Sequence, residues 1–182
     1  MRQVSVRCIL AVVALAMFMA GPVFAQDKEV VVAAGWAPQY LSVEGGSTTA
    51  PLGLFGDVAF SVTKNIQIVG DLGYARKSES GATFSLITAA GGGRYLIPTS
   101  SNSKVSPFVE GLVGIGYISA GIDDMSGSQT GLGFGVGGGV DVKASGNLNV
   151  RVQANYFLCR ISGVNFNELR FGIGLSMASK IK

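Results

Sequence analysis

Apolar and polar side chains alternate with a period of two along most of this 182-residue chain. The clearest example is Asn147–Leu158, where apolar side chains occupy every second position and asparagine, arginine and glutamine lie between them. An amphipathic helix repeats every 3.6 residues and would not keep this alternation over such a length. The pattern therefore predicts β-strands, each with one apolar face and one polar face.

Eight segments carry the alternation, with turn residues between them. They span residues 29–37, 52–63, 65–75, 82–97, 105–118, 131–143, 147–158 and 168–177. In the fourth segment Phe84 and Leu86 are out of phase with Ile87 and Tyr95, which predicts a β-bulge there. The connections 63–65 and 144–147 are short, whereas 38–51, 76–81, 120–130 and 160–165 are expected to be the loops at the opposite end.

The polar face carries charged residues on seven of the eight segments. These residues are Asp57, Asp71, Arg94, Glu110, Asp141, Lys143, Arg151, Glu168 and Arg170. A soluble barrel would have an apolar inside, so an uninterrupted aliphatic and aromatic face beside this set favours a membrane barrel with the charges inside. We expect an eight-stranded antiparallel up-and-down transmembrane β-barrel, plugged by its own charge network and without a porin-sized channel. A soluble sandwich with these charges outside is the alternative.

The N-terminus has the layout of a cleaved secretory signal. Arg2 and Arg7 precede the apolar run 9–20, and small residues suit a cut after Ala25. The predicted domains are a signal peptide at 1–25 and a barrel at 26–182. The mature chain would keep 12 of the 14 basic residues and all 11 acidic ones, so its net charge falls to +1. No basic stripe remains, and nucleic acid is not expected as a partner.

Nothing in the sequence indicates a catalytic, cofactor-binding or metal site. The chain has no histidine, which excludes Ser-His-Asp and Cys-His catalysis. Asp123 and Asp124 form a paired acidic cluster but are too few for a calcium site, and Cys159 has no visible activating base. A Gly-x-Gly-x-x-Gly match at 133–138 continues into strand-like sequence and not into a helix, so it does not predict nucleotide binding.

Several motifs resemble small outer-membrane β-barrel proteins. The stretch Val105–Tyr117 is similar to their strand motif PYVGAGVGY, and Gly92–Leu96 (GGRYL) is similar to GGRYYF. The stretch Gly133–Asn155 resembles GAGVDYRLSDNLSLRLEYRY, and Leu169–Ser176 resembles their last strand, although no C-terminal aromatic residue follows it. The resemblance implies an OmpA/OmpX-like eight-stranded barrel of the porin-like class, located in the bacterial outer membrane.

The function expected from these observations is that of a non-enzymatic integral outer-membrane protein with a structural or surface-interaction role. Its partners would be outer-membrane lipid, the barrel-insertion machinery and an unidentified contact of its outer loops, and the barrel would be a monomer. The alternative is a secreted or periplasmic lipocalin-like barrel that binds a small apolar ligand. An apolar cavity together with solubility without detergent would distinguish this alternative.

Overall fold

The alternating segments form the strands of a single closed antiparallel sheet. The computed structural model describes residues 29–43, 46–79, 82–100, 102–122, 125–161 and 164–180. The strands are β1 (Glu29–Trp36), β2 (Gln39–Val43), β3 (Gly46–Ala50), β4 (Leu52–Ser61), β5 (Ile66–Glu79), β6 (Ala82–Leu96), β7 (Val105–Ile122), β8 (Met125–Ser145), β9 (Leu148–Ile161) and β10 (Val164–Lys180). Within those ranges no helix is long and apolar enough to cross a membrane.

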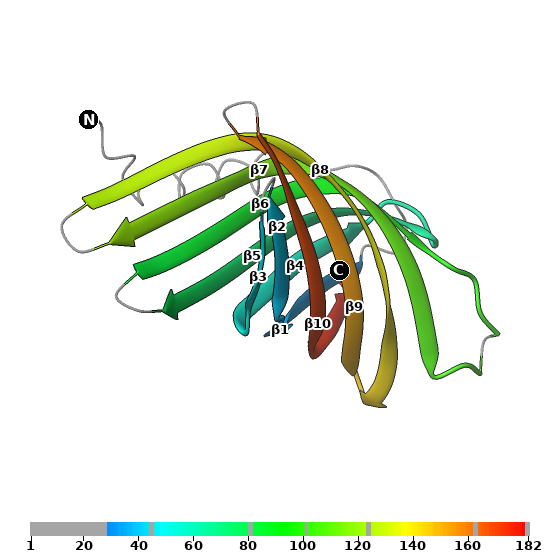
Figure 1. The fold of residues 1–182 in the computed structure, drawn as a ribbon. Helices are drawn as coiled ribbons and strands as arrows, with labels where there is room; N and C mark the ends of the chain where they lie inside the picture. The colour runs from blue at the N-terminus through cyan, green and yellow to red at the C-terminus, as the bar shows by residue number, and fades with distance from the viewer. Residues whose placement is uncertain are drawn as a thin grey trace.

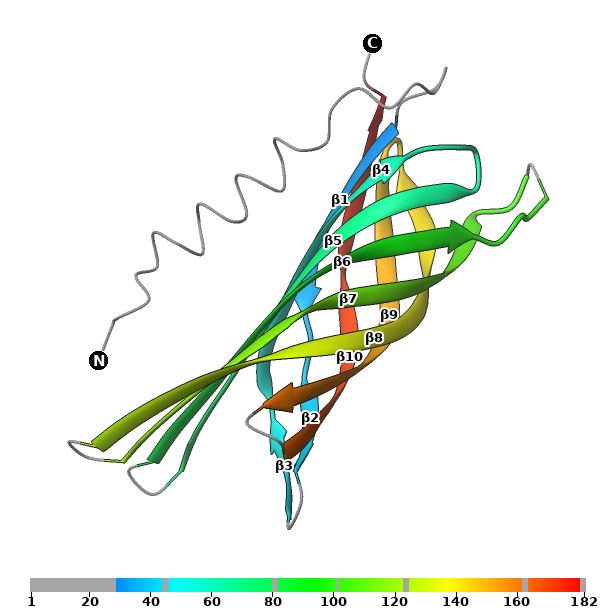
Figure 2. The same cartoon turned by 90° about the horizontal axis from the view of Figure 1, so that it is seen from above.

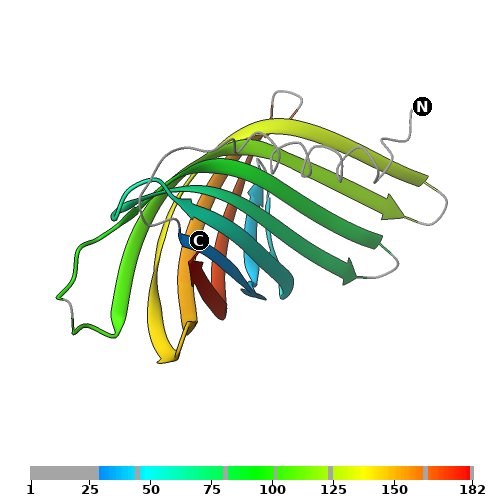
Figure 3. The same ribbon diagram turned by 180° about the vertical axis from the view of Figure 1, so that it is seen from behind.

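From β4 to β10 each strand pairs with the next one in the chain, β1 pairs with β4, and β2 pairs with β10 and β3. The ring closes where β1 pairs with β10, from Glu29↔Lys180 to Trp36↔Ile173. The first and last strands therefore lie side by side (Figures 1 and 3). Pro38 and Pro51 separate β1 from β2 and β3 from β4, so these four strands make one interrupted hairpin. The wall has eight strands, as the sequence predicted, and an up-and-down topology.

The alternation places polar side chains inside and apolar side chains outside. Along 151–160 every odd-numbered residue is buried and every even-numbered residue is exposed. The outer face bears large apolar side chains such as Leu54, Phe134 and Ile173, each more than half exposed. Soluble proteins rarely expose apolar patches of this extent, so the face needs an apolar environment.

The two ends of the barrel differ. At one end, here called the turn end, β4–β5, β6–β7 and β8–β9 are joined by segments 62–65, 97–104 and 146–147. Gly146 has a φ of 52°, which suits glycine in this tight turn. The other end, the hairpin end, carries the tips of β2–β3, β5–β6, β7–β8 and β9–β10.

Two details differ from the sequence prediction. The segments 38–51, 76–81, 120–130 and 160–165 were expected to be loops, but most of their described residues are in strands. The bulge expected in 82–97 is absent, because the ladders of β6 with β5 and β7 run without a register shift. Leu86, which broke the alternation, is buried inside the barrel. The predicted signal peptide, residues 1–25, lies outside the described residues.

Candidate functional site

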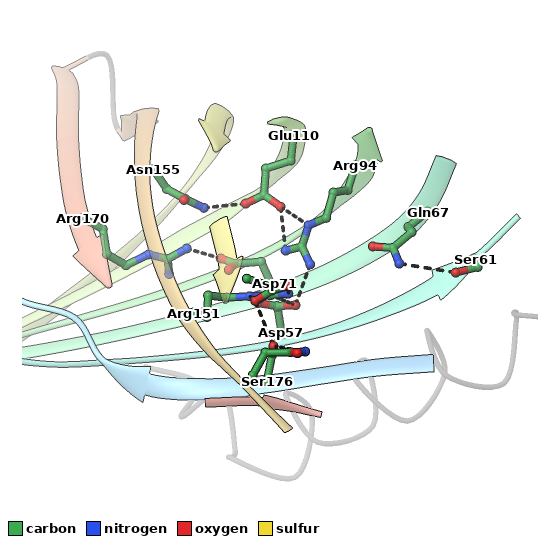
Figure 4. A network of polar contacts seen from close by, with 12 residues as sticks. Asp57, Ser61, Gln67, Asp71, Arg94, Glu110, Arg151, Asn155, Arg170 and Ser176 are labelled. Atoms are coloured by element: carbon green, nitrogen blue, oxygen red, sulfur yellow. Dashed lines mark hydrogen bonds and ion pairs between the residues drawn. The ribbon is translucent and has the colours of Figure 1, made fainter. Parts of the chain in front are cut away.

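Three arginines form ion pairs with four acids inside the barrel, and Figure 4 shows most of these side chains. The larger group, here called the ion-pair network, consists of Asp57 on β4, Arg94 on β6, Glu110 on β7, Asp141 on β8 and Arg151 on β9. Arg94 and Arg151 are each only 1% exposed. Each arginine donates to two different acids, so five strands are joined by charged hydrogen bonds across the lumen.

Asp57 is the centre of the network. Its Oδ1 accepts a hydrogen bond from Arg94 Nη1 at 3.0 Å, and its Oδ2 accepts one from Arg151 Nη1 at 2.6 Å. Arg94 also pairs with Glu110, with Nη2 2.7 Å from Oε2. Arg151 binds Asp141 through two parallel hydrogen bonds of 2.8 and 2.6 Å, the strong bidentate geometry of a guanidinium with a carboxylate.

Uncharged side chains complete the network. Asn155 donates to the second oxygen of Glu110 at 2.7 Å, and the Ser176 hydroxyl donates to Asp141 at 2.8 Å. The Phe108 ring lies beneath both guanidinium groups, at 4.3 Å from Arg94 and 4.9 Å from Arg151. A cation over an aromatic face gains more when it is desolvated. The aromatic residue therefore both fills space and favours the two arginines electrostatically.

A second ion pair joins Arg170 on β10 to Asp71 on β5, beside the ion-pair network. Asp71 stands directly opposite Asp57 in the β4–β5 ladder, a like-charge arrangement that is unfavourable unless cations compensate it. Arg170 supplies this compensation, with Nη2 2.6 Å from Asp71 Oδ1. Glu168 is buried two residues away on β10 and faces Leu41 and Phe157 in its ladders. It marks the boundary between the charged interior and an apolar region toward the hairpin end.

The structure places eight of the nine sequence-predicted site residues on the inner face of the barrel. Asp57, Arg94, Glu110, Asp141 and Arg151 meet in the ion-pair network, and Asp71 with Arg170 forms the second pair. Lys143 differs from the expectation, because its side chain is exposed. It lies near the turn end, beside the register shift between positions 143 and 145 of β8, where the lumen opens.

Several interior residues were not in the predicted set. The buried amides and hydroxyls are Gln39, Gln67, Thr88, Gln153, Asn155 and Ser176. The alternation places these side chains on the polar face, but an amide or a hydroxyl indicates an interior position less strongly than a charged group does. Phe108, Leu112 and Phe157 are buried apolar residues on the inner face, and a pattern that assigns apolar residues to lipid does not find them.

The glycines of β8 leave room for large neighbouring side chains. A Cβ on Gly135 would lie 2.7 Å from the Phe157 ring, and one on Gly139 would lie 2.8 Å from the Phe108 ring. A Cβ on Gly137 would lie 2.7 Å from the Asn155 amide. The inward glycines of β8 therefore accommodate aromatic rings and an amide.

The other sequence features have the following positions. Gly133, Gly135 and Gly138 all lie within β8, with no helix after them. Cys159 is buried among apolar residues on β9. The pair Asp123 and Asp124 lies outside the described residues. Among those that the structure describes, no group of three or more histidine, cysteine, aspartate or glutamate side chains is arranged to hold a metal ion.

Comparison with known proteins agrees with this architecture. The family model for the outer membrane protein beta-barrel domain matches residues 11–176. The chain belongs to this family. No curated protein matches it in sequence. As an outer-membrane barrel it sits in the lipid of the bacterial outer membrane. Periplasmic turns in such barrels are short, which leads us to expect the turn end on the periplasmic side.

Solved structures of small outer-membrane barrels have the same fold. Neisserial surface protein A aligns at a TM-score of 0.69 with 18% identity, over 82% of this chain and 96% of that one. The attachment invasion locus protein Ail of Yersinia pestis aligns at 0.57 with 16% identity, over 84% of this chain and 100% of that one. AlkL aligns at 0.53 with 15% identity, over 89% and 95%.

Proposed function

We propose that this protein is a non-enzymatic integral outer-membrane barrel with a closed lumen, which presents its hairpin end at the cell surface. The observation that carries the proposal is the ion-pair network. Arg151 on β9 reaches Asp57 on β4, 94 residues earlier in the chain, and Arg94 reaches the same carboxylate from β6. Side chains from separate parts of the wall therefore meet within the lumen.

The size of the barrel supports a closed interior. Eight strands leave an interior just wide enough for side chains to fill. Here the filling consists of fully buried arginines, carboxylates, amides and the Phe108 ring. An ion crossing the lumen would have to break charged hydrogen bonds of 2.6–3.0 Å in a desolvated setting. The polar inside and apolar outside also disfavour the lipocalin-like alternative, which needs the opposite arrangement.

We infer no catalytic role from the side chains that the lumen offers. The chain has no histidine. The carboxylates of Asp57, Glu110 and Asp141 are all held by arginines in ion pairs, and an engaged carboxylate is a poor general base. We also propose a monomer that is inserted by the barrel-assembly machinery, because the pairing of β1 with β10 closes the wall along the whole of β1 and leaves no free edge there.

A surface role is supported by the hairpin end and by the relatives. The hairpins β5–β6 and β7–β8 pair with each other and extend together past the ends of their ladders with β4 and β9, away from the closed part of the wall. Two relatives of the same fold are named as a surface protein and as an attachment and invasion protein. We propose that the hairpin tips of this chain likewise contact a partner outside the cell.

Conductance in planar lipid bilayers tests the closed lumen. The purified full chain, first shown to be folded by a boiling-dependent shift in gel mobility, should give no porin-sized current steps. A general porin measured in the same bilayers is the positive control. Steady open steps from the unaltered protein would overturn the closed interior.

Thiol labelling in intact cells tests the orientation. Ser128→Cys at the hairpin end should react with a membrane-impermeant maleimide, and Ser100→Cys at the turn end should not. Both positions are exposed, and the natural Cys159 is buried, so its background is low. Labelling of Ser100→Cys in intact cells, with Ser128→Cys protected, would show the reverse orientation and exclude the proposed surface role of the hairpins.

A further inference from the structure

The barrel interior changes from charged to apolar toward the hairpin end. Beyond Glu168 the inward side chains form one buried cluster, which consists of Leu41, Ala50, Ala75, Leu86, Phe157, Cys159 and Phe166. Phe84 and Ile118 pack against it from β6 and β7. Because large apolar residues point inward here, the alternation of apolar outside and polar inside fails at Phe84 and Leu86. The ion-pair network and the side chains around it already obstruct the lumen, so closure does not account for this second region.

The wall of the barrel also divides at this level. The β4–β5 ladder reaches only to Leu52↔Arg76, and the β8–β9 ladder reaches only to Leu132↔Arg160. Beyond these pairs the described strands form two four-stranded leaves, β5–β6–β7–β8 and β9–β10–β2–β3. Figure 2 shows the two sets of strand ends diverging from each other. A seam between β3 and β5 remains, and the Lys77 ammonium donates to the Thr48 hydroxyl across it at 2.8 Å.

A cavity of about 270 Å³ that is largely open to solvent lies between the two leaves, lined by Leu41, Gly46, Ser47, Thr48, Phe84 and Phe166. Phe84 comes from the β5–β8 leaf and the other five come from the opposite leaf. Leu41, Phe84 and Phe166 give an aliphatic and aromatic lining, whereas the Thr48 hydroxyl lies on β3 at the seam. The volume is just below the roughly 300 Å³ at which pockets for drug-sized ligands begin, so the space suits one slender chain.

We propose that this cavity binds a single unbranched aliphatic chain, with the polar end of the molecule at the β3–β5 seam. The apolar lining offers no hydrogen bonds that would hold water in place, whereas each buried methylene of a ligand gains about 0.8 kcal/mol, or about fourfold in affinity. The Thr48 hydroxyl at the seam gives the polar end a hydrogen-bonding neighbour. Phe84 and Phe166 contact the chain from opposite leaves.

The chain can reach the cavity from two sources of the same chemistry. A free amphiphile such as a medium-chain alcohol can enter from the aqueous mouth at the hairpin end. An acyl chain of an outer-leaflet lipid can enter sideways through the seam between β3 and β5. Both present the cavity with the same methylene chain, and the experiment below distinguishes them.

Photolabelling of the full chain in lipid nanodiscs tests the proposal. One probe is decanol with a diazirine at the end of its chain, and the other is a phosphatidylcholine with the same diazirine on one acyl chain. Labelled residues are located by mass spectrometry of peptides. We expect labelling of the inward residues Leu41, Phe84 and Phe166 above the background on lipid-facing residues. Cavity labelling by decanol alone indicates entry from water, and labelling by the phospholipid alone indicates entry through the seam; either supports the proposal.

A matched pair of variants makes the result specific. Thr48→Trp fills the cavity, whereas Thr49→Trp puts the same side chain on the exposed face of the same strand. Labelling of the inward residues should fall about fourfold or more in Thr48→Trp, because a ligand that buries one methylene fewer binds about fourfold more weakly. Labelling should be unchanged in Thr49→Trp. The boiling-dependent gel shift confirms that both variants are folded. Labelling by both probes confined to lipid-facing residues, or an equal effect of the two substitutions, would overturn the proposal.

Discussion

Replacing Arg151 with methionine tests whether the ion-pair network stabilises the closed barrel. Arg151 makes four hydrogen bonds of 2.6–2.8 Å, two to Asp57 and two to Asp141. Methionine keeps most of the side-chain length and packing but removes all four. The loss of Arg151 leaves the buried carboxylate of Asp57 and the partly buried carboxylate of Asp141 with fewer partners. Uncompensated buried charge is the main cost of breaking such a pair.

The magnitude follows from the partners that remain. Removing one member of a buried ion pair costs about 3–5 kcal/mol. Asp57 would keep its bond from Arg94 Nη1, and Asp141 would keep its bond from the Ser176 hydroxyl. Neither acid is left without a donor, so we expect the lower end of the range, about 3 kcal/mol less free energy of unfolding.

Equilibrium urea unfolding in lipid vesicles measures this change, with the boiling-dependent gel band as the readout for the folded barrel. Lys143→Met is the matched control, because it removes a cation from an exposed position of β8 and should change stability by about 0.5 kcal/mol or less. The double variant with Asp141→Asn should cost less than the sum of the two single variants, because both remove the same bonds. An Arg151→Met barrel as stable as the Lys143→Met barrel would refute the stabilising role of the network.

Two further outcomes follow from the structure. Gly35→Ala should destabilise the barrel by about 1–3 kcal/mol, because the added Cβ would overlap the backbone of Ile173 and Gly174 where β1 meets β10. Gly70→Ala is the control, because its Cβ meets open space and should not destabilise the barrel; urea unfolding compares the two variants. Trp36, the single tryptophan, is half exposed on the outer wall, so lipids with brominated chains should quench its fluorescence in the folded barrel but not after unfolding in urea; equal quenching in both states would contradict a lipid-facing position.

The strands in the membrane wall could be predicted because their two faces meet different surroundings. On β9, Arg151 and Asn155 face the charged lumen while Val152 and Tyr156 face lipid. Polar residues are therefore favoured at every second position, and apolar residues at the positions between them. Toward the hairpin end this contrast disappears. Hairpin β2–β3 lies in the segment expected to be a loop, because there the sequence shows no period-two contrast.

The positions of the charges could be predicted, but their partners could not. Asp57 and Arg151 are 94 residues apart, and which acid an arginine reaches depends on the strand tilt and stagger of the closed barrel, not on sequence spacing. The sequence pattern near Phe84 was interpreted as a β-bulge, and here too the sequence alone was ambiguous. Periodicity shows that a residue is out of phase, but a bulge and an apolar patch inside the barrel produce the same pattern.

The closed lumen proposed above limits where a ligand of the apolar region can go. With the ion-pair network blocking the passage toward the periplasm, an aliphatic chain held between Phe84 and Phe166 cannot continue along the barrel axis. It must leave as it entered, through the mouth or through the seam beside Thr48. The proposed site is therefore a binding site and not a transport route. Opening the network by Arg151→Met should then leave photolabelling of Phe84 and Phe166 unchanged in barrels that remain folded. Loss of labelling in such barrels would show that the two halves depend on each other.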